Sequence, residues 1–219
     1  SQIPGYTPTR LVNAGSAEEP SSSFALGIEP EPGILAGKRI VITAGGTREA
    51  LDPVRFLGNR STGKQGVALA QAARDLGASV HLIGANLEVP APEGVQVTRV
   101  VSARELRDAV LEAQNNADML IMSAAVADFR PAEYAEYKIK KIADSSDAPT
   151  IQLVRNPDIL REVVERRQKT GTGARLIVGF AAETGSAERT PLELGREKLV
   201  RKGCDFLALN TVGVNQGFG

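Results

Sequence analysis

The sequence predicts an α/β fold in which a doubly wound, mostly parallel sheet carries one inserted β-hairpin. Three observations lead to this prediction. Short apolar runs alternate with segments of helical periodicity along most of the chain. The apolar runs are nearly continuous, as expected for strands that are buried on both faces. One stretch, residues 138–154, breaks the alternation, because two strand-like runs there flank a polar turn.

Six apolar runs rich in β-branched residues are expected to be strands: residues 38–44, 78–84, 95–101, 118–124, 175–181 and 204–210. Four segments are expected to be helices: residues 64–76, residues 103–115, a segment beginning at residue 156, and residues 187–202. Strands and helices in this order form a Rossmann-like sheet that is covered on both faces.

Capping residues mark the ends of the expected helices. Ser102 and Glu105 have the spacing of a capping box at the start of the second helix. Asn156 is expected to cap the third helix, with Pro157 in its first turn. Gly203 is expected to end the fourth helix.

The inserted hairpin is expected to pair residues 138–142 with residues 150–154 around a polar turn. Such an arm often serves as a flap over a site or as a dimer contact. A surface hairpin without either role fits the pattern equally well.

Residues 1–37 show no sustained periodicity and contain five prolines and a run of three serines. This composition is typical of a flexible linker or tail. The folded domain is therefore expected to be residues 38–219. Because the chain stops shortly after a strand, a further C-terminal segment is expected to be missing from it.

The composition excludes several functional classes. Lysine plus arginine equals aspartate plus glutamate, 26 each, so no net charge favours nucleic acid or a membrane surface as a partner. No apolar run approaches the roughly 20 residues that span a bilayer. The single cysteine, Cys204, excludes an internal disulfide and suits a reducing, cytoplasmic location. The single histidine, His81, lies in an expected strand and is interpreted as a packed structural residue.

The loop of residues 44–66 is the first candidate for a ligand site, because ligands of open parallel sheets lie beyond the carboxyl ends of the strands. It begins with Gly45 and Gly46 and ends with Ser61, Thr62 and Gly63 before a helix. Glycines allow close approach to an anion, and hydroxyls and helix-start N–H groups donate to phosphate. The loop contains neither a Walker motif nor GxGxxG. A long loop with ordinary helix-capping hydroxyls is the alternative.

The loop after the fourth strand is the second candidate. Ser123, Ala124 and Ala125 leave room for a flat ring against the backbone. Asp128 can accept a hydrogen bond or hold a divalent cation. Small residues at this position would equally allow a helix to pack closely.

A lysine cluster, Lys138, Lys140 and Lys141, follows this loop. Mobile lysines suit a triphosphate, and a lysine that closes over developing charge affects the rate of a reaction. A solvated charge run is the ordinary explanation, although Ile139 and Ile142 alternate with the lysines as on a strand with one packed face.

The third candidate combines residues 156–159 with Phe180, which ends an expected strand where a base could stack. A core phenylalanine is the ordinary alternative. Lys198 and Lys202 are four residues apart on the last helix and therefore share a face, a spacing that solvation alone also explains.

Taken together, these segments resemble phosphopantothenate–cysteine ligases, also called phosphopantothenoylcysteine synthetases. The likeness spans residues 35–219 and rests on six motifs in order: ITAGGTREALDPVRFLGNRSTGKQG, SAAVADFRP, KIKK, NPDIL, VGFAAET and KLVRKGCDFLALN. In most bacteria this domain is the C-terminal half of a bifunctional coenzyme A biosynthesis protein. The resemblance therefore implies a fused N-terminal decarboxylase that alone carries a flavin, with residues 1–37 as the joining linker.

The resemblance also implies the reaction. Members join 4′-phosphopantothenate to cysteine through an acyl-cytidylate, with CTP as the co-substrate and Mg²⁺ or Mn²⁺ as the cation. They are cytoplasmic homodimers, to which the hairpin is expected to contribute.

Carried onto this sequence, the resemblance assigns catalytic roles to Asn59, which would hold the acyl-cytidylate or phosphopantothenate, and to Lys138, which would close over the reacting phosphate. It assigns Asp128 as a metal ligand. The residues expected to bind the nucleotide are Gly45, Gly46, Ser61, Thr62, Gly63, Lys64, Ser123, Ala124, Ala125, Asp128, Lys138, Lys140, Asn156, Pro157, Asp158, Ile159, Phe180, Lys198 and Lys202.

Two alternatives remain at this point. A nicotinamide-dependent oxidoreductase would use the same sheet, but its second strand normally ends in an acidic residue or an arginine, whereas residues 84–86 read Gly-Ala-Asn. A non-catalytic nucleotide-binding module would use the same loops without needing lysines on a flap.

Overall fold

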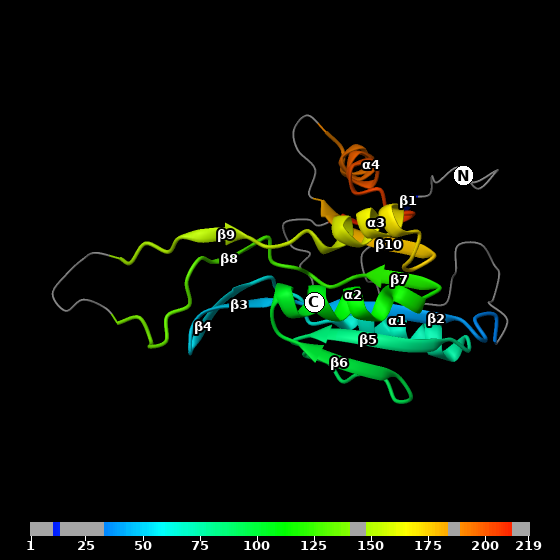
Figure 1. Ribbon diagram of the computed structural model, residues 1–219, viewed down its shortest axis with the longest axis horizontal. Coiled ribbons are helices and arrows are strands. Elements are labelled where there is room, and N and C mark those ends of the chain that lie inside the picture. Colours follow the sequence, from blue (N-terminus) through cyan, green and yellow to red (C-terminus); the bar gives the residue numbers. More distant parts are fainter. Residues whose placement is uncertain (1–10, 14–32, 141–147, 184–188, 212–219) are drawn as a thin grey trace.

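The computed structural model describes residues 11–13, 33–140, 148–183 and 189–211, and a parallel sheet forms its centre (Figure 1). Seven strands pair in the order β1-β11-β10-β7-β2-β5-β6, and every pair is parallel. The strands are β1 (Leu11–Asn13), β2 (Arg39–Gly45), β5 (Ser79–Ala85), β6 (Gln96–Val100), β7 (Met119–Met122), β10 (Leu176–Glu183) and β11 (Phe206–Thr211).

Helices cover both faces of this sheet. They are α1 (Lys64–Asp75), α2 (Ala103–Ala113), followed by the 3₁₀ turn η1 (Gln114–Asn116), α3 (Ile159–Thr170) and α4 (Pro191–Lys202). Val41 packs in a cluster with α2 and α3, whereas its neighbours Ile40 and Ile42 pack in a second cluster with α1. Because successive strand residues point to opposite faces, the two clusters lie on opposite sides of the sheet. The predicted doubly wound α/β fold is confirmed.

The predicted strands and helices are also confirmed, with ends that differ by a few residues. The Ser102 side chain caps α2 by accepting from the Glu105 N–H, as predicted. The Glu105 carboxylate, however, accepts from the N–H of Val101, one residue earlier than in a full capping box.

Two helix starts differ from the prediction. The cap of α3 is Asp158 and not Asn156, because the Asp158 carboxylate accepts from the N–H of Arg161. Helix α4 begins at Pro191, several residues later than predicted, and Thr190 with Glu193 forms a complete capping box there. Residues 184–188 lie outside the described part of the chain.

The inserted arm is present, but its strands are not the predicted ones. Strand β9 (Leu153–Arg155) pairs in antiparallel register with β8 (Phe129–Pro131), not with residues 138–142. The ladder starts at the base of the arm, where the Asn156 N–H donates to the Asp128 carbonyl. The register that continues from this bond pairs β9 with β8. The alternating residues 138–140 form no strand. Residues 141–147 lie outside the described part.

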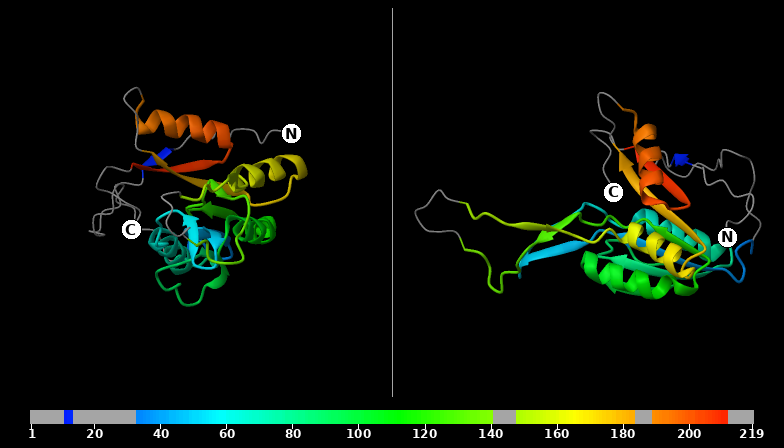
Figure 2. Two further views of the ribbon diagram at one scale, coloured as in Figure 1. Left: turned by 90° about the vertical axis from the view of Figure 1, so that its left-hand side faces the viewer. Right: turned by 45° about the horizontal axis from the view of Figure 1, so that its top comes forward.

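A second antiparallel hairpin lies inside the segment that was expected to be only a loop. It consists of β3 (Arg48–Asp52) and β4 (Arg55–Gly58) and packs against β8. We call residues 129–140 and 148–155 the arm. Both views in Figure 2 show the arm, and the right-hand view shows it projecting from the sheet together with β3 and β4.

Parts of the segment expected to be a linker take part in the fold. Strand β1 pairs with β11 at the edge of the sheet, and the Leu35 N–H donates to the Leu76 carbonyl. Residues 1–10 and 14–32 lie outside the described part. None of the helices in the described ranges is both long and apolar enough to cross a membrane.

His81 is a packed residue of β5, as predicted. Its Nε2 lies 2.8 Å from the Thr98 hydroxyl, and burial lowers the pKa of the ring. Burial likewise raises the pKa of the Cys204 thiol.

Candidate active site

The loops after β2 and β7 are joined where these neighbouring strands end. The Gly45 carbonyl accepts from the Ala125 N–H at 2.8 Å, and the Thr47 N–H donates to the Ala125 carbonyl at 3.0 Å. Gly46 and Ala125 form an isolated parallel bridge. The glycine turn and the small-residue loop, far apart in the sequence, therefore form one continuous rim.

Two buried threonines fix the second loop against the first. The Thr43 hydroxyl accepts from the Ala124 N–H at 3.1 Å, and the Thr47 hydroxyl accepts from the Ala127 N–H at 2.9 Å. The Ser123 hydroxyl donates to the Thr43 carbonyl. Ser123 therefore shapes the rim, and its proton is already committed to the protein backbone.

The glycines of the rim stand where a side chain does not fit. A Cβ on Gly45, whose φ is 87°, would lie 1.9 Å from the Ala85 carbonyl oxygen. A Cβ on Gly46 would lie 2.8 Å from the Asn59 carbonyl oxygen, and one on Gly63 would lie 3.2 Å from the Gly45 nitrogen. The turn after β2 therefore packs directly against the segment that leads into α1.

The start of α1 is not closed by a side chain. Its N-cap is Gly63, no side chain caps it, and its first turn contains no acidic residue. The Thr62 hydroxyl accepts from the Lys64 N–H, but at 3.4 Å. This arrangement differs from ordinary capping by Ser61 and Thr62, and it leaves the positive end of the helix dipole at the rim. Uncapped N–H groups of this kind are suited to an anion.

Asn59 connects the α1 segment to the small-residue loop. Its Nδ2 donates to the Val126 carbonyl at 3.1 Å. The side chain is exposed, so a ligand can reach it. The third predicted segment joins at the same place, because Asn156 donates to the Ala127 carbonyl at 2.8 Å.

Asp128 is exposed on this loop, and its carbonyl accepts from the N–H of Asn156. Across the described ranges, no three or more His, Cys, Asp or Glu side chains are grouped so that they could hold a metal ion. One carboxylate still fits Mg²⁺ bound to a nucleotide, because this cation usually takes most of its ligands from phosphates and water.

Phe180 is half-buried on β10. Because Gly179 pairs with Met122, Phe180 is level with Ser123 at the end of β7. Ile159 is buried in the core, so its side chain packs inside the protein. The Lys202 ammonium forms an ion pair with the Asp158 carboxylate, which links the end of α4 to the start of α3. Lys198 lies one turn earlier on α4.

Lys138 and Lys140 are not brought to the rim within one chain. Ile139, between them, is bonded to Asp52 and Arg55 at the turn of the β3–β4 hairpin. The other end of this hairpin, at Arg48 and Gly58, adjoins the rim. Four residues of extended strand place the lysine segment about 13 Å farther out along the hairpin.

Three residues that the sequence analysis missed contribute to this region. Asn86 has a left-handed backbone, with φ 48°, and its amide donates to the carbonyls of Gly46 and Val101 at 2.8 and 3.0 Å. Its position at the end of the second strand could have identified it, because Asn tolerates this conformation. Asp52 and Arg55 are the first and last residues of an Asp-Pro-Val-Arg turn, and its Asp-Pro pair could have predicted their hairpin.

Known proteins resemble this chain over most of its length. The family described as DNA/pantothenate metabolism flavoprotein C-terminal domain matches residues 35–219. The coenzyme A biosynthesis bifunctional protein CoaBC of Mycobacterium tuberculosis (strain ATCC 25618 / H37Rv) is 52% identical over 186 residues, which cover 84% of this chain and 44% of that protein. The chain thus spans about half the length of the curated relatives it matches.

Solved structures show the same fold. The crystal structure of the C-terminal domain of a coenzyme A biosynthesis bifunctional protein CoaBC is 38% identical, with a TM-score of 0.66 over 80% of this chain and 78% of that one. A Cab2 mutant in complex with phosphopantothenate-cysteine is 20% identical, with a TM-score of 0.61 over 80% and 73% of the two chains. The latter likeness concerns the fold alone.

Proposed function

Because the chain belongs to the family of DNA/pantothenate metabolism flavoprotein C-terminal domains, we propose that it joins 4′-phosphopantothenate to L-cysteine in coenzyme A biosynthesis, with CTP as co-substrate. The relatives named as coenzyme A biosynthesis proteins support this proposal. The observation that carries it is the rim itself, where backbone hydrogen bonds join the glycine turn to the loop of Asp128 and the uncapped start of α1 packs against the glycine turn.

The reaction has two steps. The carboxylate of phosphopantothenate attacks the α-phosphorus of CTP, a new P–O bond forms, and pyrophosphate leaves. The cysteine amine then attacks the acyl carbon, the C–N bond forms, the nitrogen loses a proton to solvent, and CMP leaves with the electrons of the acyl–oxygen bond. Activation is needed because a free carboxylate is a poor acyl donor. The protein therefore has to position the reactants and to stabilise charge on the phosphates.

The rim residues have distinct roles in this proposal. Gly45 and Gly46 let phosphate oxygens approach the backbone, and the segment from Ser61 to Lys64 donates N–H groups, hydroxyls and one positive charge. Ala124 and Ala125 leave room for the nucleotide beside Ser123. Asn59 holds the acyl-cytidylate while the amine attacks.

The nucleoside end of CTP lies towards β10 in this proposal. Asn156, Pro157 and Asp158 contribute mainly backbone groups, since the side chains of Asn156 and Asp158 are already engaged with the protein. Phe180 stacks on the base or the ribose. Lys198 and Lys202 add positive charge from α4.

A divalent cation, Mg²⁺ or Mn²⁺, would be held by Asp128 together with phosphate oxygens and water. When bound, it would neutralise part of the triphosphate charge. The carboxylate of Asp128 is exposed at the rim and is suited to this role.

We further propose that the chain acts as a homodimer whose arms contact each other. Large apolar side chains are exposed on the arm and on the β3–β4 hairpin: Val54, Phe56, Leu57, Phe129, Tyr134, Tyr137, Ile151 and Leu153. Tyr137, next to the catalytic candidate Lys138, is 82% exposed. Pairing of two arms would cover this surface. It would also allow Lys138 of one copy to serve the rim of the other.

We further propose that the whole protein also contains a flavin-dependent decarboxylase domain, and that both activities are located in the cytoplasm. The relatives that are named bifunctional and are about twice as long as the matched segment support the first point. A single cysteine, buried as a free thiol, suits a reducing compartment.

The decisive test is nucleotide consumption by the purified chain. We expect release of CMP and pyrophosphate only when CTP, phosphopantothenate and cysteine are all present, with weaker turnover of ATP. Hydride transfer to a nicotinamide cofactor without CTP turnover would favour the oxidoreductase. A CTP-induced shift in melting temperature without any turnover would favour a binding module. Chromatography of products with each substrate omitted in turn distinguishes these outcomes.

A further inference from the structure

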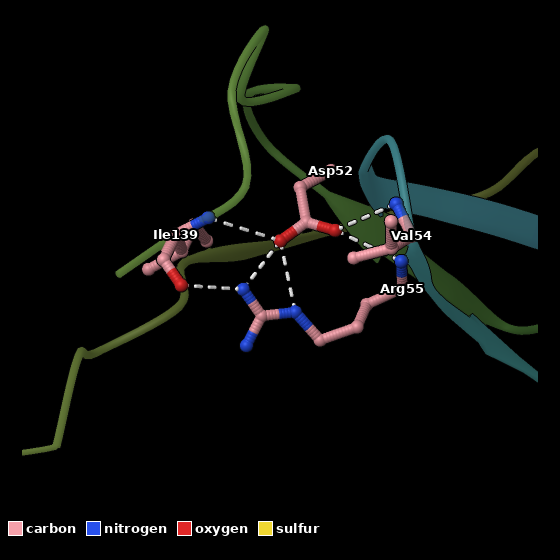
Figure 3. A network of polar contacts seen from close by, with 4 residues as sticks. All are labelled: Asp52, Val54, Arg55 and Ile139. Atoms are coloured by element: carbon pink, nitrogen blue, oxygen red, sulfur yellow. Dashed lines mark hydrogen bonds and ion pairs between the residues drawn. The ribbon is translucent and has the colours of Figure 1, made fainter. Parts of the chain in front are cut away.

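The carboxylate of Asp52 is buried and receives five donors (Figure 3). Its Oδ1 accepts from the N–H groups of Val54 and Arg55 at 3.0 and 2.8 Å. Its Oδ2 accepts from Nε of Arg55 at 2.8 Å and from the N–H of Ile139 at 3.2 Å, and also from Nη2 of Arg55. The same Nη2 donates to the Ile139 carbonyl at 2.8 Å.

This network exceeds what the turn between β3 and β4 requires. One side-chain oxygen is enough to accept the two backbone N–H groups of such a turn, and Asn or Ser provides one without a buried charge. A buried carboxylate is costly unless it is paired. The second oxygen and the guanidinium of Arg55 instead hold both polar groups of Ile139, which is 87 residues away from Asp52 in the sequence.

Ile139 lies between the two lysines of the arm. It is half-buried, whereas Lys138 and Lys140 are exposed. Together with Leu51 and Ile151, Ile139 lines a pocket of about 360 Å³ between the hairpin and the arm. A second bond, from the Ala135 N–H to the Leu51 carbonyl at 3.0 Å, fixes the same segment. The backbone that carries Lys138 and Lys140 is therefore attached to the β3–β4 hairpin at two residues, Ala135 and Ile139.

The surroundings of Asp52 favour the ionised form of its carboxyl group. The Arg55 guanidinium, together with the backbone donors, holds the pKa of the Asp52 carboxyl far below its usual range despite burial. The carboxyl group is thus ionised, and able to accept hydrogen bonds, near neutral pH.

We propose that Asp52 is a positioning residue for the ligase reaction: through Arg55 and the Ile139 peptide, its carboxylate sets the place from which Lys138 acts. This inference rests on the proposed function of Lys138. Asp52 itself touches no substrate, and it acts by reducing the number of conformations that the lysine segment can adopt.

Limited trypsin digestion tests the structural half of the proposal without depending on activity. We expect cleavage after Lys138 and Lys140, relative to cleavage after the exposed Lys169, to become about tenfold faster in Asp52→Asn, because the freed segment opens more often. Asp52→Asn keeps one oxygen for the turn, so the hairpin is expected to fold. Asp75→Asn, an exposed acid on α1, is the matched control and should leave the ratio unchanged.

Arg55→Lys provides a second variant in case Asp52→Asn does not fold. The Arg55 side chain is 44% exposed, and lysine keeps the charge but cannot bond the Asp52 carboxylate and the Ile139 carbonyl in the same fork geometry. The same increase in relative cleavage is expected. Unchanged cleavage ratios in folded Asp52→Asn or folded Arg55→Lys would overturn the proposal.

Kinetics test the functional half. Per folded molecule, kcat for pyrophosphate release in Asp52→Asn should fall about tenfold while KM for CTP stays within a factor of two, because the lysine acts on the transition state. A purely structural defect would lower only the folded fraction. Faster cleavage with an unchanged kcat would refute positioning. Absence of turnover in the wild-type chain would instead count against the ligase itself, and the cleavage ratio would still decide whether Asp52 holds the segment.

Discussion

Asn59, Thr43 and Thr47 show how single side chains build the rim. The two threonine hydroxyls accept backbone N–H groups of the small-residue loop, and the Asn59 amide donates to the carbonyl of Val126. Thr43 and Thr47 are fully buried and Asn59 is exposed. The threonines therefore hold the loop in place, whereas Asn59 can turn one of its polar groups towards a ligand.

At this scale we predict that Asn59→Ala separates the two steps of the reaction. Activation should continue, while amide formation slows by roughly a hundredfold, because a positioned donor next to the reacting acyl group is lost. Acyl-cytidylate should then accumulate in acid-quenched reactions analysed by mass spectrometry. Asn115→Ala removes an exposed amide at η1 and is the control. Unchanged coupled turnover in Asn59→Ala would contradict the role of this residue.

Helix starts illustrate the scale of elements. Helix α1 follows Gly63 without a side-chain cap, whereas α2, α3 and α4 are capped by Ser102, Asp158 and Thr190. An uncapped start costs stability, because helix N–H groups lose their acceptors. Among the helices of the described ranges, α1 thus lacks a side-chain cap, and it begins at the rim, where a phosphate can take the place of the cap.

The capping box of α4 gives a prediction on stability. Thr190→Ala should lower the free energy of unfolding by about 1 kcal/mol, because the Glu193 N–H loses its acceptor. Urea denaturation measures this change. Glu197→Gln, on the same helix, removes an exposed ion pair with Arg189 and should change the free energy by less than about 0.5 kcal/mol. Equal effects of the two substitutions would argue against the cap.

The same box predicts a pH dependence. Donation by the Thr190 N–H and hydroxyl lowers the pKa of the Glu193 carboxyl. A lowered pKa means that the stabilisation is complete above the ordinary glutamate value and is lost as the pH falls through the folded-state value. An NMR titration should therefore place the Glu193 midpoint below that of exposed glutamates. Thr190→Ala should move this midpoint upwards.

At the scale of the whole molecule, the lysines and the rim are separated. Within one chain, Lys138 is held at the outer end of the β3–β4 hairpin, and the rim lies at the inner end. The exposed apolar side chains of the arm lie in the same region as the lysines. A dimer would cover these side chains and bring the lysines of one copy to the other.

Mixing inactive variants tests this arrangement. Lys138→Gln alone should release little pyrophosphate, and Asn59→Ala alone should form little product. If Lys138 serves the partner's rim, each mixed dimer contains one intact site, and random mixing of chains should restore about a quarter of the wild-type turnover. A mixture of Asn59→Ala with the double variant Asn59→Ala/Lys138→Gln is the control. It should remain inactive, because neither chain has an intact Asn59. No recovery, despite exchange of chains shown by mass spectrometry, would exclude action across the dimer.

Most of the fold follows from local patterns. Near-continuous apolar runs such as residues 38–44 identify strands buried on both faces, and helical periodicity identifies the segments between them. The convergence of the glycine turn with the loop of Asp128 also follows, because the carboxyl ends of parallel strands meet at one edge. These conclusions need only the spacing of apolar residues along the sequence and the knowledge that the strands run parallel.

Only the tertiary structure decided how the arm is paired and where its lysines lie. Residues 138–142 alternate like a strand, yet β9 pairs with β8, in a register that continues from the bond between Asn156 and Asp128 at the base of the arm. The bonds from Asp52 and Arg55 to Ile139 cross 87 and 84 residues of sequence. Contacts over such separations depend on the register of two hairpins relative to each other, which side-chain periodicity within either hairpin does not determine.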